Sequence, residues 1–220
     1  MQGGADETVG EIFRVDLLER ARDKTFQVIQ EAAAQMKPGM TELDAKTLIQ
    51  EIQTRLGAPK SWHPPQIRFG VNSVLPFGER GVEGVKLQTN DIFFFDIGPI
   101  FEGHEGDVGR PFVLGNDSDY LRCRDDVETV WKEVHGHWKE TGATGAELYA
   151  FAEKQASSRG WKLLLNHANG HRISDFPHAA KARGSVEGWE RHPAPNRWIL
   201  EIQIRHPEMP FGAFYEDLLS

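Results

Sequence analysis

The sequence predicts an α+β domain built from two related halves, each with two helices followed by a pair of strands. The first observation is an internal echo: PGMTELDAKTLIQEIQTRLGAP at 38–59 and TGATGAELYAFAEKQASSRGWK at 141–162 share a turn, a capping threonine, a helical stretch and a glycine stop. The second is that apolar runs typical of strands come after each of these segments. The 220 residues suit a single domain over 11–220, preceded by a glycine-rich, acidic arm at 1–10 that we expect to be flexible.

Four helices are expected where apolar residues recur at helical spacing. In the first of them Leu17, Ala21 and Ile29 lie near helical spacing, and Lys37-Pro38-Gly39 ends the pattern. Thr41 is the expected N-cap of the second. The predicted helices cover 11–36, 41–56, 119–140 and 144–158.

Four strands are expected from short apolar runs, which lie at 91–101, 107–115, 198–204 and 212–219. The first two are separated only by EGHEG, which indicates a hairpin. The stretch 61–81 is so rich in proline and glycine that we expect no regular structure there, and 166–178 is expected to be a histidine-rich loop.

Composition and charge exclude several functional classes. The net charge is −8 and no block of Lys and Arg occurs, so no nucleic-acid partner is expected. The single cysteine, Cys123, allows no intrachain disulfide. Apolar runs such as 92–95 are too short to cross a bilayer, and MQGGADETVGEIF lacks the pattern of a signal peptide. We therefore expect a soluble, cytoplasmic protein without a membrane partner.

Two aspartates, Asp96 and Asp107, lie in or next to apolar strand sequence, where a charged side chain is not expected. Asp96 lies inside the apolar run IFFFDIG, and a buried carboxylate is unfavourable unless it is paired, hydrogen-bonded or metal-bound. If Glu102-Gly103 forms the hairpin turn, Asp107 lies opposite Gly98 and diagonal to Asp96, on the same face and roughly 7–8 Å away at the backbone. Two carboxylates so placed can reach a shared metal. The hairpin alone leaves open that both are solvated acids at strand ends or turns.

Two glutamates strengthen the metal hypothesis. Glu201 in WILEIQI and Glu216 in AFYEDLL are further acids within apolar strand sequence. As structural ion pairs they would need buried basic partners, yet these strands hold few besides Arg110 and Arg205. Gathering four acids around cations is the electrostatically favoured arrangement.

Histidines complete the candidate site, because carboxylate and imidazole together suit divalent transition metals. His171 and His178 stand in NHANGHRISDFPH, a loop of the kind that carries function on a rigid scaffold. Four others are interpreted as ordinary surface or helix residues: His135, His137, His192 and His206.

The segments FDIGPIFEGHEGDVGRPFVLG, NGHRISDFPH, LEIQI and FYEDLL resemble, in this order, the pita-bread metallopeptidases, which include methionine aminopeptidases, Xaa-Pro aminopeptidases and prolidases. The resemblance begins at about Asp16, and the GDVGR spelling is closest to the Xaa-Pro branch. It implies the pita-bread fold, with a curved antiparallel sheet. It also implies metal-dependent cleavage of a peptide or amide bond by water activated on two divalent ions, either Mn, Co, Zn or Fe.

Carried over to this sequence, the resemblance implies five metal ligands and two catalytic residues. The ligands would be Asp96, Asp107, His171, Glu201 and Glu216. Glu201 would also move protons beside the attacking water, and His178 would contact the substrate or the tetrahedral intermediate.

Substrate-side positions depart from the family pattern. Phe77 in VNSVLPFG replaces a substrate-contacting histidine, and Arg172 replaces the glycine after the metal histidine. We expect Phe77 to form an apolar cleft wall and Arg172 to reach across the cleft mouth to a substrate carboxylate. The alternative for Arg172 is that it folds back onto a surface acid such as Asp175. His104 replaces an aromatic residue within the Asp hairpin.

Retention of all five implied ligands favours a metallopeptidase of the Xaa-Pro type that acts on a small peptide or amide. The alternatives are a non-catalytic peptide-binding domain and an amidohydrolase of a small non-peptide substrate. The expected partner is the small peptide or amide substrate, and self-association into a homodimer stays open.

Overall fold

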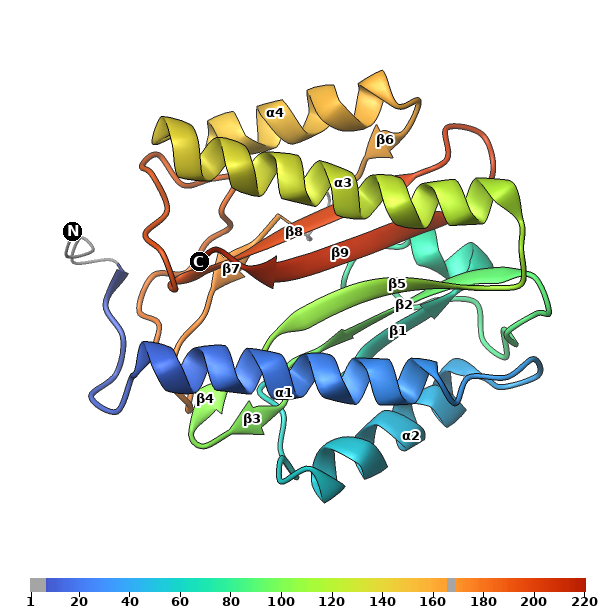
Figure 1. Ribbon diagram of the computed structural model, residues 1–220, viewed down its shortest axis with the longest axis horizontal. Coiled ribbons are helices and arrows are strands. Elements are labelled where there is room, and N and C mark those ends of the chain that lie inside the picture. The colour runs from blue at the N-terminus through green and yellow to red at the C-terminus, as the bar shows by residue number, and fades with distance from the viewer. Residues whose placement is uncertain (1–6, 166–168) are drawn as a thin grey trace.

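A computed structural model gives the structure of residues 7–165 and 169–220, in which four α-helices pack against an antiparallel sheet (Figure 1). The helices are α1 (Val15–Ala33), α2 (Glu42–Arg55), α3 (Ser118–Thr141) and α4 (Gly145–Ser158). The first is shorter than predicted at both ends, and the other three agree almost to the residue. The predicted α+β class is confirmed.

The main sheet has the strand order β1-β2-β5-β9-β8-β6, and β7 pairs with β8 beside this path. Its strands are β1 (Gln66–Phe69), β2 (Asp91–Ile97), β5 (Val108–Leu114), β6 (Lys162–Leu163), β7 (His171–Arg172), β8 (Trp198–Arg205) and β9 (Gly212–Leu218). A small separate hairpin joins β3 (Ile100–Phe101) to β4 (His104–Glu105).

Each half of the chain has a hydrophobic core of its own. Helices α1 and α2 cover β1, β2 and β5 through a cluster that includes Ile29 and Phe95. Helices α3 and α4 cover β8 and β9 through a cluster that includes Trp131 and Ile202. Figure 1 shows the first pair below the strands and the second pair above them. The halves meet where β5 lies beside β9, with Gly109 opposite Glu216.

The echoed segments form matching helix starts. Thr41 and Thr144 each accept a hydrogen bond from the backbone N–H three residues ahead, and the acids there, Asp44 and Glu147, accept one from the threonine N–H in return. This reciprocal capping box satisfies backbone donors that have no partner inside the helix. The same local chemistry therefore begins the second helix of both halves.

Two expectations are wrong in part. The stretch 61–81 contains β1 and a 3₁₀ helix (Gly70–Val74), although proline and glycine surround them. Residues 7–10 are not a flexible arm: Glu7 is buried, and its Oε1 accepts hydrogen bonds from the indole N–H of Trp198 at 2.6 Å and the backbone N–H of Ala194 at 2.8 Å. Residues 1–6 of the predicted arm lie outside the described residues. Within the described residues, no helix is long and apolar enough to cross a membrane.

We predict that Glu7→Ala lowers the free energy of unfolding by about 2 kcal/mol, because it leaves the Trp198 and Ala194 donors without their acceptor. Urea denaturation followed by tryptophan fluorescence measures the change. The matched control is Glu11→Ala at an exposed position, which should change stability little. Equal stabilities for the two variants would show that residues 7–10 are a loose arm after all.

Candidate metal centre

The acids of the apolar strands face a cavity because strand residues alternate between two faces. In β8, Leu200 and Ile202 pack into the core beneath α3 and α4, and Glu201 between them lines the cavity. In β9, Tyr215 packs into that core and Glu216 lines the cavity. A carboxylate inside an apolar run thus marks the face of the strand that points away from the helices.

The cavity has a volume of about 310 Å³ and brings together all five residues implied as ligands. The predicted hairpin register is correct, since Ile97 lies opposite Val108 and Ile100 opposite Glu105. Glu102 and Gly103 have positive φ at the turn. The register therefore places Asp107 across from Gly98 and diagonal to Asp96.

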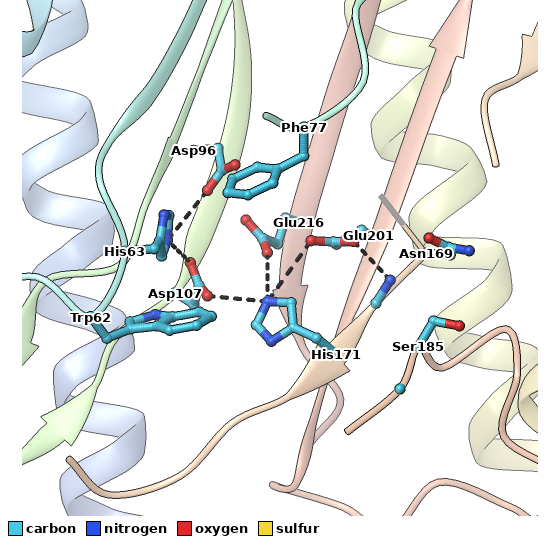
Figure 2. Close-up of a pocket in the computed structure, with 12 residues that line it drawn as sticks. Trp62, His63, Phe77, Asp96, Asp107, Asn169, His171, Ser185, Glu201 and Glu216 are labelled. Atoms are coloured by element: carbon cyan, nitrogen blue, oxygen red, sulfur yellow. Dashed lines mark hydrogen bonds and ion pairs between the residues drawn. The ribbon is translucent and has the colours of Figure 1, made fainter. Parts of the chain in front are cut away.

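Asp107 lies at the centre of the group (Figure 2). Its Oδ2 is 3.2 Å from Nε2 of His171, and its Oδ1 is 3.1 Å from Nε2 of His63. On the first side, His171 Nε2 is also 3.5 Å from Glu216 and 3.8 Å from Glu201. The two oxygens of one carboxylate thus face two separate sets of groups.

His63 is a site residue that the sequence did not reveal. Its Nε2 lies 3.6 Å from Asp96 as well as near Asp107, and its side chain is 10% exposed. It stands in the proline-rich stretch SWHPP, which has no periodicity to indicate a face. The available signal was its position just before β1, which pairs with the strand of Asp96. Trp62, Asn169 and Ser185 also line the cavity and were not predicted.

Burial and charge perturb every titratable group of this cluster. Burial raises the pKa of Asp96 to about 7, and it raises the pKa of Glu216 further above its usual value, with Asp107 and Asp96 adding to the effect. Burial opposes charge on His63, yet Asp107 and Asp96 raise its pKa to about 9. Burial likewise opposes charge on His171, and the adjacent carboxylates of Asp107 and Glu216 raise its pKa well above 6.5. Without a cation, the cavity therefore retains protons at neutral pH.

The donor set fits divalent cations. For comparison, Asp217 on the opposite face of β9 is paired with Arg22 and Arg110. Among the described residues, no Lys or Arg forms an ion pair with any acid of the cavity. Asp107 Oδ2 and Glu216 Oε2 are buried and accept no hydrogen bond there. Two groups of atoms, His63/Asp96/Asp107 and Asp107/His171/Glu216, each lie within 4.8 Å of one another, as metal ligands would.

Comparison with known proteins identifies the family. The family model described as metallopeptidase family M24 matches residues 16–219. The chain belongs to metallopeptidase family M24.

Relatives of this M24 domain carry more than one activity. It is 24% identical to an Xaa-Pro dipeptidase of Lactobacillus delbrueckii, over 82% of this chain and 49% of that protein. It is 23% identical to methionine aminopeptidase A of Synechocystis, over 76% of this chain and 67% of that protein. The crystal structure of an X-Pro aminopeptidase from Thermotoga maritima matches 92% of this chain and 56% of its own, with a TM-score of 0.73 and 20% identity. The fold is the pita-bread fold, and the chain spans about half the length of the Xaa-Pro relatives.

Two residues implied as substrate contacts lie in different settings. Phe77 lines the cavity and its ring stands edge-on to that of His63. His178 does not line it: its Nδ1 is 2.8 Å from buried Glu105, and its ring stacks on Trp62, which does line the cavity. The part of the predicted histidine-rich loop at 166–168 lies outside the described residues.

The expectation that Arg172 reaches across the cleft mouth is wrong. His171 and Arg172 are neighbours in strand β7, so their side chains point to opposite faces. The guanidinium is buried, where it donates hydrogen bonds to the backbone carbonyls of Arg197 and Thr8 and lies over the ring of Trp198. The alternative partner, Asp175, does not bind it either; its Oδ1 accepts from Gly10 N–H and Ser174 Oγ–H. Arg172 therefore holds the N-terminal segment.

His104 also has a structural explanation. Its Nε2 accepts a hydrogen bond of 2.9 Å from the backbone N–H of Arg14, at the residue before α1. Its ring is buried beside Phe13. His104 therefore links the β3–β4 hairpin to the start of α1, and it does not line the cavity.

We predict that divalent metal affinity increases as pH rises from about 6.5 toward 9. The sign follows from the raised pKa values of His63, about 9, and of His171. Both shifts favour the positively charged rings at neutral pH, and a cation binds among these acids more readily once the rings lose that charge. Calorimetric titration with Mn²⁺ or Co²⁺ in buffers of different ionisation enthalpy should show proton release. Affinity that is constant across this range would contradict the placement of a metal next to His171.

We predict that Arg172→Ala lowers the free energy of unfolding by about 2 kcal/mol or more, because buried hydrogen bonds and packing on Trp198 are lost. The preference between dipeptide acids and dipeptide amides should stay as in the wild type. Arg80→Ala, which removes an exposed guanidinium, is the control for loss of charge alone. A changed preference in Arg172→Ala at unchanged stability would restore the substrate-binding role.

Proposed function

We propose that this M24 domain is a metal-dependent hydrolase of the Xaa-Pro type, which cleaves a peptide or amide bond with two divalent ions. The observation that supports it best is the placement of Asp107, whose two oxygens face His63 on one side and His171 on the other. A single buried carboxylate between two groups of donors is suited to hold two cations side by side. Asp96, Glu201, Glu216 and His171 supply the remaining ligands of the proposed centre.

The position of each cavity residue indicates its role in the proposed hydrolysis. Divalent cations, when bound, polarise the scissile carbonyl and lower the pKa of a water molecule. Glu201 would hold and pass the proton of that water, because its Oε2 is fixed at 2.7 Å by the Gly170 N–H while its Oε1 points toward His171. Burial raises the pKa of Glu201 above its usual value, which favours uptake of a proton by this carboxylate.

The substrate would lie between Phe77 and the metal-binding acids. The 45% exposed Phe77 offers an apolar wall, which fits a small substrate with an apolar body. His178 would contact the substrate from the edge of the site, where its pairing with Glu105 orients the ring. Xaa-Pro specificity is supported by the name of the Lactobacillus relative, and the methionine aminopeptidase of Synechocystis is the competing assignment.

The test is hydrolysis by protein loaded with Mn²⁺, Co²⁺ or Zn²⁺, using Xaa-Pro dipeptides, methionyl peptides and small amides in parallel. Xaa-Pro dipeptides should be cleaved fastest. Asp107→Asn should lose metal and reduce hydrolysis by about 10²-fold or more, because the shared ligand loses its charge. Asp125→Asn makes the same change at an exposed helix position and should be silent.

The same measurements separate the alternatives. Faster cleavage of methionyl peptides would replace the Xaa-Pro assignment and keep the peptidase. Metal binding with hydrolysis of amides alone would favour the amidohydrolase. Metal or peptide binding without any hydrolysis would identify a binding domain and overturn the proposal.

A further inference from the structure

We propose that His63 is a sixth protein ligand of the metal centre, so that each half of the fold supplies one histidine and two carboxylates. The first half supplies His63, Asp96 and Asp107, and the second supplies His171, Glu201 and Glu216. The inference deepens the function proposed above and rests on its metal centre. It adds a ligand beyond the five that the family resemblance implied.

The two histidines present themselves to the acids in the same way. Nδ1 of His63 lies 3.0 Å from the carbonyl oxygen of Pro64, and Nδ1 of His171 lies 2.8 Å from that of Arg172. A backbone carbonyl only accepts hydrogen bonds, so Nδ1 carries the proton in both rings. Nε2 is then the atom available to a cation, and in both rings it points at Asp107. Anchoring of the far nitrogen by a carbonyl is how metal-binding histidines are oriented.

The positions of the two histidines in the sheet are also equivalent. β1, which begins shortly after His63, pairs with the strand that carries Asp96. β7, which contains His171, pairs with the strand that carries Glu201. Each histidine therefore comes from the segment that flanks an acid-bearing strand on its outer side. The echo between the halves, first visible in the helices, extends to the ligands.

The segment that carries His63 is fixed against the Asp hairpin. The backbone N–H of Trp62 donates to the carbonyl of Gly98, and that of Ile100 donates to the carbonyl of Lys60, both at 2.9 Å. A Cβ at Gly98 would lie 2.3 Å from the Trp62 indole nitrogen and 2.5 Å from the His63 ring. Glycine at 98 thus permits the approach that brings His63 to Asp96 and Asp107.

The geometry on the His63 side suits coordination. Nε2 of His63 lies 3.1 Å from Asp107 and 3.6 Å from Asp96. One ligand atom from each of these three residues lies within 4.8 Å of the others, so together they would hold a cation on this side of Asp107. A second imidazole also shifts the preference of the site from Mn²⁺ toward Co²⁺ and Zn²⁺.

The test compares wild type, His63→Ala and the control His137→Ala, which removes an imidazole from helix α3, outside the cavity. Each protein is loaded with Co²⁺, its cobalt content is measured, and the number of imidazoles per cobalt is determined by X-ray absorption spectroscopy. His63→Ala should lose imidazole scattering and bind Co²⁺ about 10²-fold more weakly, with a smaller loss for Mn²⁺. His137→Ala should resemble the wild type.

A second variant guards against misfolding of His63→Ala. In His63→Cys, a thiolate on the metal would give Co²⁺ a charge-transfer absorption in the near ultraviolet that the wild type lacks. The native Cys123 is buried in the α3 core, away from the cavity, and is present in both proteins. Appearance of this band supports coordination at position 63.

The outcomes distinguish the inference from the function on which it rests. Unchanged imidazole number and cobalt content in His63→Ala, with no thiolate band in His63→Cys, would overturn the sixth ligand and leave the hydrolase intact. Wild-type protein that binds cobalt through both histidines without hydrolysing any substrate would overturn only the function. Absence of cobalt binding in the wild type would overturn both.

Discussion

Four buried carboxylates share a cavity of about 310 Å³ with two histidines, and their mutual repulsion is the constraint on which the rest of the site depends. Taking such charges out of water is unfavourable unless opposite charges compensate for the loss. Asp217, one residue from Glu216, shows the ordinary solution, since two arginines neutralise it. The cavity uses protons at neutral pH instead, as the raised pKa values of Asp96 and His63 show. Divalent cations in place of those protons would satisfy the same requirement.

Much of the fold could be predicted because its determinants are local. Capping threonines and helical spacing located the helices, and the turn at Glu102-Gly103 fixed the register that brings Asp107 near Asp96. Glu201 was recognisable for an equally local reason, since alternation along a strand allows one apolar face and one charged face. Each of these signals lies within a stretch of a few residues, so it can be recognised without knowledge of the tertiary structure.

The rest depended on contacts between distant segments. His63 stands in a proline-rich stretch without periodicity. Its packing against Gly98, more than thirty residues away in the sequence, places it beside Asp96 and Asp107. The sequence predicts a loose arm at Glu7 because its partner, Trp198, lies at the far end of the chain. The reason for the wrong placement of Arg172 is different. The sequence predicts a loop there, but a short strand forms, and strand geometry points the Arg172 side chain away from that of His171.

The metal centre lies where the two halves of the fold meet, so metal binding affects how firmly the halves are held together. The halves have separate cores, and β5 meets β9 with Gly109 opposite Glu216. Asp107 belongs to one half, and His171 and Glu216 belong to the other. A cation held among them binds only while the halves are docked, so its binding free energy adds to the stability of the docked state. The catalytic ions of the proposed enzyme would then also hold the two halves together. The free energy needed to separate β5 from β9 would increase with the concentration of free metal.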